Sequence, residues 1–291
     1  MSVSKLDKLE EMYGRFLDTS SIQNKVLNVE YGKVSERNKL DIYYPEDFDK
    51  TKKYPTVVFF HGGGFFKGDK GRYQLLGALQ GIYNGYAVIS VNYRLTVHAP
   101  YPAYMLDCAA ALRFIKAEGE KYNLDTEHVA LWGESAGSFI AVVLGFIGER
   151  NSIFDDYSIN EYKEKLHTNV VIDWYGPSGE VNEVGSLKRN DFKIAEIKLP
   201  ILNDEDLEKY CQAEGVEKYM DQNSPALLIQ HGTADEFVPI NNSENLYEMY
   251  KKLCDGNKVE FDVFEGFHHG VGEFTNDENI KHVFDFLNKN I

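Results

Sequence analysis

The chain has 291 residues, of which 43% are hydrophobic and 26% are charged, and its formal net charge is −15. This composition is typical of a folded protein with a large core and excludes an intrinsically disordered chain. The negative charge argues against nucleic acid and anionic membranes as partners, because both repel an acidic surface. The length fits one α/β domain, residues 1–291, that carries an insertion.

The cysteines Cys108, Cys211 and Cys254 are odd in number and widely spaced. They therefore predict neither a disulfide framework nor a metal site. The N-terminus lacks the apolar segment of a signal peptide, and the apolar run at residues 139–147 is too short to span a bilayer. We expect a reduced, cytoplasmic protein with no membrane partner.

The first predicted element is a helix. Apolar residues recur at helical spacing over residues 4–18, between charged residues. We place this amphipathic helix within residues 1–22 and expect it to pack on the body of the domain or near the site entrance.

Strands and helices alternate after this helix. Residues 56–60 are continuously apolar, as expected for a strand buried on both faces of a mostly parallel sheet. The other predicted strands are residues 25–31, 40–44, 87–91, 129–132, 170–174, 226–230 and 259–264. The predicted helices are residues 74–84, 104–122, 138–148, 243–253 and 279–288. This order predicts an α/β protein with a mostly parallel eight-stranded sheet and helices on both faces.

One interval breaks the alternation. Residues 176–224 are rich in charge and poor in core residues. We interpret them as a small inserted cap of short helices, of which residues 204–213 give the clearest pattern.

The sequence Gly133-Glu-Ser-Ala-Gly137 lies between a predicted strand and a predicted helix. This is the context of a nucleophile elbow, in which a sharp turn presents Ser135 at its tip. The turn strains the serine backbone, and glycines two residues to either side avoid clashes with it. The positive end of the following helix would lie beneath the hydroxyl.

A serine hydroxyl needs a base to take its proton and a carboxylate to orient that base. Asp235 follows the predicted strand at 226–230, and Glu236 beside it is a rival that a tight loop would direct elsewhere. His268 and His269 both follow the strand at 259–264. We expect His269 to be the base, because Gly270 lets the loop bend over the site, and we keep His268 as the alternative.

Acyl transfer also requires N–H donors for the negative oxygen of the tetrahedral intermediate. His61-Gly-Gly-Gly-Phe65 follows the strand at 56–60, and we expect its donors to be the N–H groups of Gly63 and Gly64. The Ala136 N–H would be the third. An ordinary tight turn is the alternative for this loop. A phosphate-binding loop is not expected, because neither G-x-x-x-x-G-K-[ST] nor G-x-G-x-x-G is present. His61 is expected to brace the loop by hydrogen bonds.

Three aromatic residues could line a substrate pocket. Phe65 follows the glycine loop, and Trp174 and Tyr175 end a strand beside the inserted segment. Core packing is the alternative for Trp174 and Tyr175. Asn92-Tyr93-Arg94 is expected to pack under the glycine loop.

Together these motifs resemble the α/β-hydrolase carboxylesterases, and more narrowly the hormone-sensitive-lipase-like and bacterial feruloyl-esterase-like group. The motifs that carry the resemblance are His61–Phe65, Asn92–Arg94, Tyr101-Pro-Ala103 with Asp107, Gly133–Gly137, His231-Gly-Thr-Ala-Asp235 and His269-Gly270. The resemblance covers residues 25–290. It implies an α/β-hydrolase fold and a serine esterase without cofactor that acts on short acyl esters.

By position, the resemblance implies Ser135 as nucleophile, Asp235 as acid and His269 as base, with an oxyanion loop at Gly63 and Gly64. The acid lies in an H-G-x-x-D form followed by Val238-Pro239, which is closer to the feruloyl-esterase-like branch. The cap matches the group poorly, and caps shape the pocket.

The expected partner is a small-molecule or oligosaccharide ester, such as an acetylated or feruloylated sugar. An amidase such as an arylformamidase, or a peptidase, is the alternative, because one triad serves many bonds. A non-catalytic hydrolase-fold receptor is a more distant alternative, since such proteins typically lose the serine or the histidine.

Overall fold

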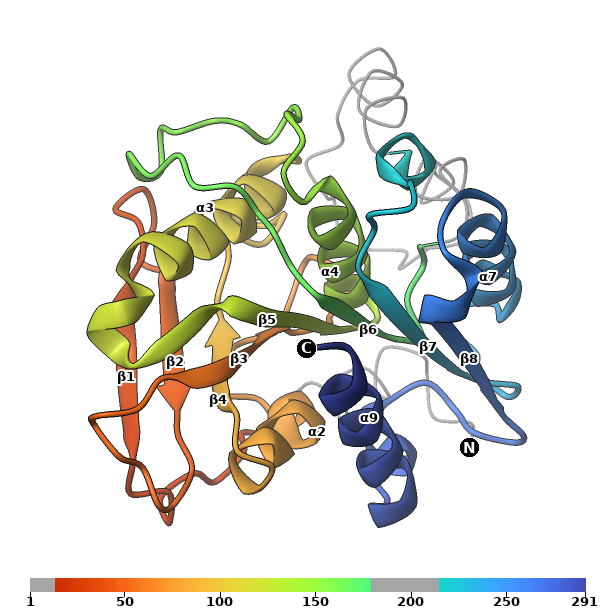
Figure 1. Ribbon diagram of the computed structural model, residues 1–291, viewed down its shortest axis with the longest axis horizontal. Coiled ribbons are helices and arrows are strands. Elements are labelled where there is room, and N and C mark those ends of the chain that lie inside the picture. Colours follow the sequence, from red (N-terminus) through yellow and green to blue (C-terminus); the bar gives the residue numbers. More distant parts are fainter. Residues whose placement is uncertain (1–13, 179–214) are drawn as a thin grey trace.

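The computed structural model describes residues 14–178 and 215–291 (Figure 1). Its centre is an eight-stranded sheet in the order β1-β2-β4-β3-β5-β6-β7-β8. The strands are β1 (Lys25–Glu30), β2 (Lys39–Tyr43), β3 (Tyr54–Phe60), β4 (Ala87–Val91), β5 (Leu124–Glu134), β6 (Val170–Trp174), β7 (Ala226–Gly232) and β8 (Val259–Phe264). The pairs β1–β2 and β2–β4 are antiparallel, and the other five pairs are parallel. The predicted mostly parallel, eight-stranded sheet is confirmed.

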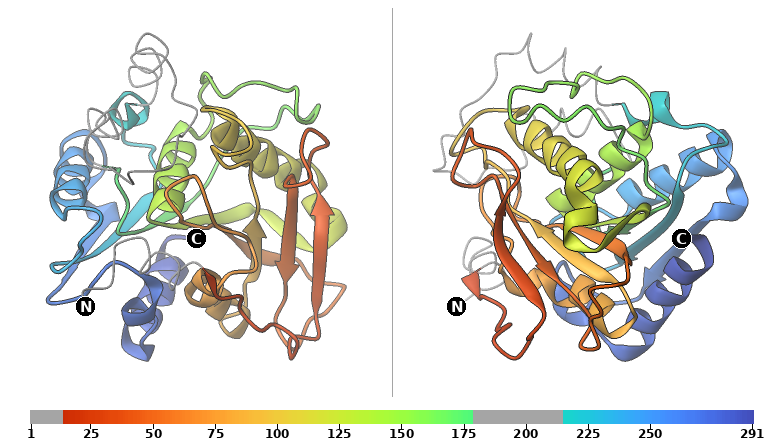
Figure 2. Two further views of the ribbon diagram at one scale, coloured as in Figure 1. Left: turned by 180° about the vertical axis from the view of Figure 1, so that it is seen from behind. Right: turned by 60° about the vertical axis from the view of Figure 1, so that its left-hand side comes forward.

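Helices cover both faces of the sheet, as predicted. In Figure 1, α3, α4 and α7 lie above the sheet, and α2 and α9 lie below it. Figure 2 shows the same two layers from behind. The helices are α2 (Leu76–Leu79), α3 (Ala103–Glu118), α4 (Ala136–Ile147), α7 (Asn241–Leu253), α8 (Val271–Phe274) and α9 (Asp277–Asn290).

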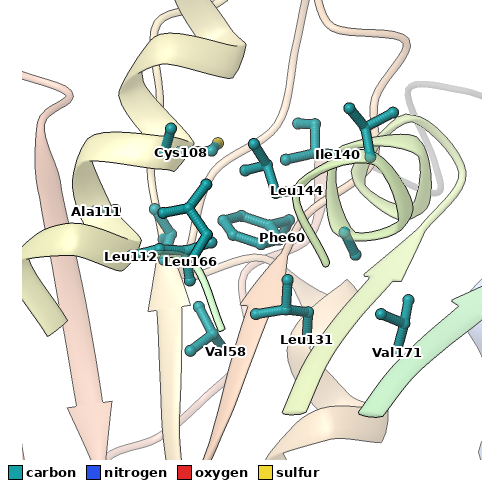
Figure 3. Close-up of a cluster of buried hydrophobic side chains, with 14 of the residues drawn as sticks. Val58, Phe60, Cys108, Ala111, Leu112, Leu131, Ile140, Leu144, Leu166 and Val171 are labelled. Atoms are coloured by element: carbon teal, nitrogen blue, oxygen red, sulfur yellow. The ribbon is translucent and has the colours of Figure 1, made fainter. Parts of the chain in front are cut away.

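Each face of the sheet has its own core, because successive side chains of a strand point to opposite faces. In β3, Val58 and Phe60 belong to the upper core, whereas Val57 and Phe59 belong to the lower one. Figure 3 shows the upper core, where side chains of β3, β5 and β6 meet helices α3 and α4. Its labelled residues are Val58, Phe60, Cys108, Ala111, Leu112, Leu131, Ile140, Leu144, Leu166 and Val171. Burial on both faces explains why these strands read as unbroken apolar runs.

The segment predicted as one helix over residues 74–84 is instead three short pieces. A 3-10 turn (Tyr73–Leu75) leads into α2, and a second 3-10 turn (Gln80–Tyr83) follows it. Glycine weakens an α-helix, and this segment has two of them. A Cβ at Gly77 would lie 2.5 Å from the Trp174 ring, so close packing on the sheet requires this glycine.

The end of the predicted N-terminal helix is extended rather than helical. Phe16 forms an antiparallel bridge with Arg72, and the Leu17 N–H donates to the Gly71 oxygen at 2.9 Å. The Arg72 guanidinium also lies 3.9 Å from the centre of the Phe16 ring. These long-range contacts override the helical pattern over residues 15–17. Residues 1–13 of the predicted helix lie outside the described residues.

Most of the predicted cap, residues 179–214, also lies outside the described residues, including the helix expected at 204–213. The described part after it begins with a 3-10 turn, Val216–Tyr219. Val216 and Tyr219 are buried in the upper core. The segment that leads into β7 therefore packs as part of the domain body.

Candidate active site

Ser135 occupies the sharp turn between β5 and α4. Its backbone has φ 51° and ψ −123°, a strained conformation that non-glycine residues rarely adopt. A Cβ at Gly133 would lie 2.2 Å from the Gly137 oxygen, and one at Gly137 would lie 2.0 Å from the Phe60 oxygen. Both glycines are therefore required by close backbone approach. The turn has the geometry of the predicted nucleophile elbow.

His269 lies on the loop after β8 and meets the serine directly. Its Nε2 is 2.9 Å from Ser135 Oγ, and the residue is 6% exposed. The neighbouring His268 is exposed, and its ring faces Glu273, with Nδ1 3.7 Å from a carboxylate oxygen. Gly270 has φ 136°, which lets the loop turn back over the site. The structure thus brings His269, and not His268, to Ser135.

Asp235 lies in the turn after β7 and holds the other side of the imidazole. Its Oδ2 is 2.6 Å from His269 Nδ1, and its Oδ1 accepts from the backbone N–H groups of Phe237 and Val238, each at 2.8 Å. Burial would raise the pKa of Asp235, but hydrogen bonds from His231 and His269 outweigh it and leave this pKa well below its usual range. The rival Glu236 accepts from the backbone N–H of His269 at 3.4 Å.

These contacts fix the tautomer of His269. An ionised carboxylate only accepts hydrogen bonds, so Nδ1 carries the proton that faces Asp235. Nε2 is then the acceptor for the Ser135 hydroxyl. This arrangement can take a proton from the serine and hold the positive charge that results.

His231 also holds Asp235, a role that its motif alone does not indicate. It is fully buried at the end of β7, with Nε2 2.9 Å from the Val238 oxygen and 3.3 Å from Asp235 Oδ2. Its Nδ1 lies 2.7 Å from Ser243 Oγ. Because Nε2 faces two acceptors, it carries the proton, and Nδ1 accepts from the Ser243 hydroxyl. Its sequence signal was its place at the start of the H-G-x-x-D motif, at the end of a predicted strand.

The glycine loop after β3 lies beside the serine. Strands β3 and β5 are neighbours, with Phe60 paired to Gly133, and a Cβ at Gly62 would lie 3.2 Å from Ser135 Cβ. Gly63 and Gly64 have φ 112° and 60°. Over residues 14–178 and 215–291, the N–H groups of Gly63, Gly64 and Ala136 have no hydrogen-bond acceptor. An oxyanion site requires N–H donors of this kind, so these three groups are its candidates.

His61 and Tyr93 brace this loop from below. The Tyr93 hydroxyl donates to the His61 carbonyl at 2.6 Å, and the two rings stack with centroids 4.3 Å apart. His61 Nδ1 lies 2.8 Å from the Gly62 oxygen. Burial lowers the pKa of His61 to about 4, so the ring is neutral at pH 7. The expected packing of the Asn92–Arg94 motif under the loop is thus observed at Tyr93.

The three aromatic residues proposed for a pocket occupy different environments. Phe65 stacks on Tyr104 with centroids 4.4 Å apart and is 5% exposed. Trp174 packs in the lower core against Trp132, which agrees with the alternative of core packing. Tyr175 is fully buried, and its ring lies edge-on to His269 at 4.7 Å.

Neither a metal site nor a membrane span is visible in the part of the chain that the structure describes. No three His, Cys, Asp or Glu side chains come together there in a way that could hold a metal ion. None of the helices described is both long enough and apolar enough to span a bilayer.

The BD-FAE family model matches residues 40–250, which is most of the chain and includes Ser135 and Asp235. The chain belongs to the BD-FAE family. A truncated form of a carbohydrate esterase from gut microbiota has a similar structure, with a TM-score of 0.77 and 26% sequence identity. That likeness covers 94% of this chain and 99% of that one. Esterase 2 of Thermogutta terrifontis, with a TM-score of 0.67 and 22% identity, shares the fold.

Curated relatives match at lower coverage. Esterase LipI of Mycobacterium tuberculosis is 36% identical over 103 residues, which are 35% of this chain and 32% of LipI. The probable carboxylic ester hydrolase LipM of the same organism is 22% identical over 238 residues, covering 78% of this chain and 52% of LipM. This BD-FAE chain therefore spans from a third to about half of these relatives. The matches confirm the resemblance to esterases and the α/β-hydrolase fold.

Proposed function

We propose that this BD-FAE protein is a serine esterase that uses Ser135, His269 and Asp235 as a catalytic triad. One observation carries the proposal: a single imidazole lies 2.9 Å from the serine oxygen through Nε2 and 2.6 Å from the aspartate through Nδ1. The names of the relatives support the reaction class, since they are esterases and carboxylic ester hydrolases.

In the first half of the reaction, Ser135 Oγ bonds to the ester carbonyl carbon while its proton passes to His269 Nε2. Asp235 stabilises the imidazolium that forms. The N–H groups of Gly63, Gly64 and Ala136 bind the oxyanion of the tetrahedral intermediate. This intermediate then breaks its bond to the alcohol, which leaves with the proton from Nε2, and an acyl-enzyme remains.

In the second half, His269 takes a proton from a water molecule as the water oxygen bonds to the acyl carbon. The new tetrahedral intermediate expels Ser135 Oγ, which regains the proton from Nε2. The products are the carboxylic acid and the free enzyme. No group beyond the triad and the N–H donors is needed to balance either half.

For the substrate, we propose a short acyl ester on a small molecule or oligosaccharide, such as an acetylated or feruloylated sugar. Support comes from the similar carbohydrate esterase structure and from the acetyl esterase of Salmonella typhi, which is 26% identical over 192 residues. An amidase or peptidase could use the same triad. Turnover of matched p-nitrophenyl esters and anilides separates these reactions, and we expect the ester to be strongly preferred.

The test of the triad is Ser135→Ala, assayed with p-nitrophenyl acetate. We expect kcat to fall by about 10³-fold or more, since triad members act as a unit. Ser21→Ala is the matched control, because Ser21 is exposed and far from Ser135 in the sequence, and it should retain full activity. Substantial hydrolysis by Ser135→Ala would show that Ser135 is not the nucleophile.

A covalent probe gives an independent test. Thermogutta terrifontis esterase 2, which has the same fold, is known in a form phosphorylated by paraoxon. We expect paraoxon to add one diethylphosphoryl group to the wild type and to Ser21→Ala, and none to Ser135→Ala, as measured by intact mass. An unlabelled wild type would favour the non-catalytic alternative.

A further inference from the structure

A second carboxylate lies beside the candidate nucleophile, and the mechanism above does not use it. Glu134 ends β5 and is 1% exposed. A carboxylate is costly to bury unless hydrogen bonds compensate for the lost water. The hydrogen bonds that Glu134 accepts therefore indicate its role.

The two oxygens of Glu134 connect two parts of the site. Oε2 accepts from the Tyr175 hydroxyl at 2.6 Å, and Oε1 accepts from the Gly62 N–H at 3.4 Å. Gly62 begins the glycine loop. Tyr175 places its ring edge-on to His269, with centroids 4.7 Å apart. Glu134 thus contacts the loop directly and reaches the imidazole through one tyrosine.

Tyr175 is held in this position at a cost. Its φ is 44°, a backbone angle that is strained for a bulky residue. Its N–H donates to the Gln230 oxygen at 2.8 Å, and its ring also packs on Phe274 at 4.8 Å. Strain at a residue that touches the base is expected where the contact serves the site.

Charge gives Glu134 a second effect. The Glu134 carboxylate and the His269 imidazole interact electrostatically, and the charge of His269 lowers the pKa of Glu134. When Ser135 gives up its proton, positive charge develops on His269. A negative charge within reach of the ring stabilises this state, in addition to Asp235.

We propose that Glu134 is a positioning residue for the esterase reaction, which holds the glycine loop through Gly62 and the base through Tyr175, and whose negative charge stabilises the protonated His269. The inference rests on the proposed triad.

The titratable groups around Glu134 and His269 set the pH dependence of the proposed effect. Glu134 faces Tyr175, His269 and, through electrostatic interaction, Tyr93. Burial raises the pKa of Glu134, and the hydrogen bond from Tyr175 and the charge of His269 offset part of this rise. His269 itself faces Asp235, and its backbone N–H faces Glu236.

The first experiment is Glu134→Gln, which keeps the shape and removes the charge. The glutamine oxygen can still accept from Tyr175, but its NH₂ group would face the Gly62 N–H. We expect kcat for p-nitrophenyl acetate to fall about tenfold with little change in KM, the size of one lost charge-assisted hydrogen bond. The acid limb of kcat/KM should move to lower pH by about 0.5 to 1 unit, because a nearby negative charge no longer favours the imidazolium.

Glu127→Gln is the matched control, because Glu127 lies on the same strand and is exposed. Its acid limb should coincide with that of the wild type. The pH midpoint does not depend on how much enzyme is folded, and paraoxon titration counts the active sites of each variant. An acid limb of Glu134→Gln that coincides with the wild type would overturn the proposal, whatever the change in kcat.

A second variant tests the route through the tyrosine. Tyr175→Phe keeps the ring against His269 and removes the hydroxyl. If the hydroxyl acts through Glu134, the variant that combines Glu134→Gln with Tyr175→Phe should be no slower than Glu134→Gln alone. The effects of the two substitutions on kcat would then be strongly non-additive. Additive losses would contradict this route.

The same measurements separate this inference from the proposed function. A wild type that neither turns over nor reacts with paraoxon would remove the triad, and the inference with it. A wild type that depends on Ser135, paired with an unshifted Glu134→Gln profile, would remove the inference alone.

Discussion

Replacing Asp235 by asparagine tests how His269 is oriented, because the change alters charge and donor pattern but hardly alters shape. In the native site, Oδ1 accepts from two backbone N–H groups, at Phe237 and Val238. Oδ2 faces the two imidazoles, at 2.6 Å from His269 Nδ1 and 3.3 Å from His231 Nε2. The asparagine oxygen must stay on the backbone N–H groups, so its NH₂ group faces both imidazoles.

This arrangement reverses the tautomer of His269. Nδ1 would then have to accept a hydrogen bond, and the ring proton would move to Nε2, opposite Ser135 Oγ. Such a ring cannot take the serine proton. We expect kcat to fall about 10³- to 10⁴-fold, as the same change does in the serine protease triad. At about 1.36 kcal/mol for each tenfold change, this loss is about 4 to 5.5 kcal/mol of transition-state stabilisation.

The assay is kcat for p-nitrophenyl acetate, with circular dichroism as a check of folding. Asp47→Asn, at an exposed aspartate, makes the same chemical change away from the site and should behave as the wild type. If Asp235→Asn kept more than about a tenth of the wild-type kcat, another group would have to orient His269, and the reasoning from the tautomer would be wrong.

Two further predictions concern stability. Gly137→Ala should lower the free energy of unfolding by roughly 3 kcal/mol or more, because its Cβ would meet backbone oxygens of Phe60 and His61 at 2.0 and 2.6 Å. Urea unfolding measures this change. Gly272→Ala is the control, because a Cβ at Gly272 would have nothing within 4 Å. Asp235 has a lowered pKa in the folded state, since hydrogen bonds from His231 and His269 outweigh the effect of burial. Its contribution to stability is therefore full above the unfolded pKa of about 3.9 and is lost as the pH falls toward the folded value. The Tm difference between wild type and Asp235→Asn should be constant above about pH 5 and shrink below it, and a difference that grew on acidification would contradict this sign.

The sheet could be predicted from the sequence because its physical cause is local in the sequence. Strands buried on both faces, such as β3 and β4, need apolar residues at nearly every position. All eight predicted strands overlap an observed one. The extended backbone at Phe16 could not be predicted, since its partner Arg72 is far along the chain. The break in the helix at 74–84 depends likewise on how closely Gly77 must approach Trp174.

The candidate site likewise combines features that a local sequence pattern predicts with features that depend on distant contacts. The position of Ser135 at the tip of a sharp turn could be predicted because the turn needs glycines at fixed spacing, and Gly270 indicated for a similar backbone reason that His269 rather than His268 faces Ser135. His231 and Glu134 lie within quoted motifs, but the motifs do not show what their side chains contact. Their positions depend on hydrogen bonds to Asp235 and to Tyr175, which the fold alone brings together. The sequence pattern thus leaves undetermined the contacts that buried polar residues of the motifs make.

The topology explains why these contacts occur together. β3, β5, β6, β7 and β8 are parallel neighbours, so the glycine loop, Ser135, Tyr175, Asp235 and His269 all follow carboxyl ends on one edge of the sheet (Figure 1). Neighbouring strands lie about 4.8 Å apart, so the loop after β8 must cross the ends of β7 and β6, a span of three strand spacings or roughly 14 Å, to reach Ser135 at the end of β5.

That crossing requires two features of the strands beneath it. At the end of β7, a Cβ at Gly232 would lie 2.1 Å from the Phe267 oxygen, so only glycine lets the loop lie this close. The Ala234 N–H then donates to the same oxygen at 3.1 Å, which holds the loop against the end of β7. At the end of β6, the ring of Tyr175 supports His269 from below, and Glu134 fixes the tyrosine hydroxyl. His269 is therefore positioned by the strands that its loop crosses as well as by Asp235, and the proposed role of Glu134 predicts that removing its charge changes the pH profile.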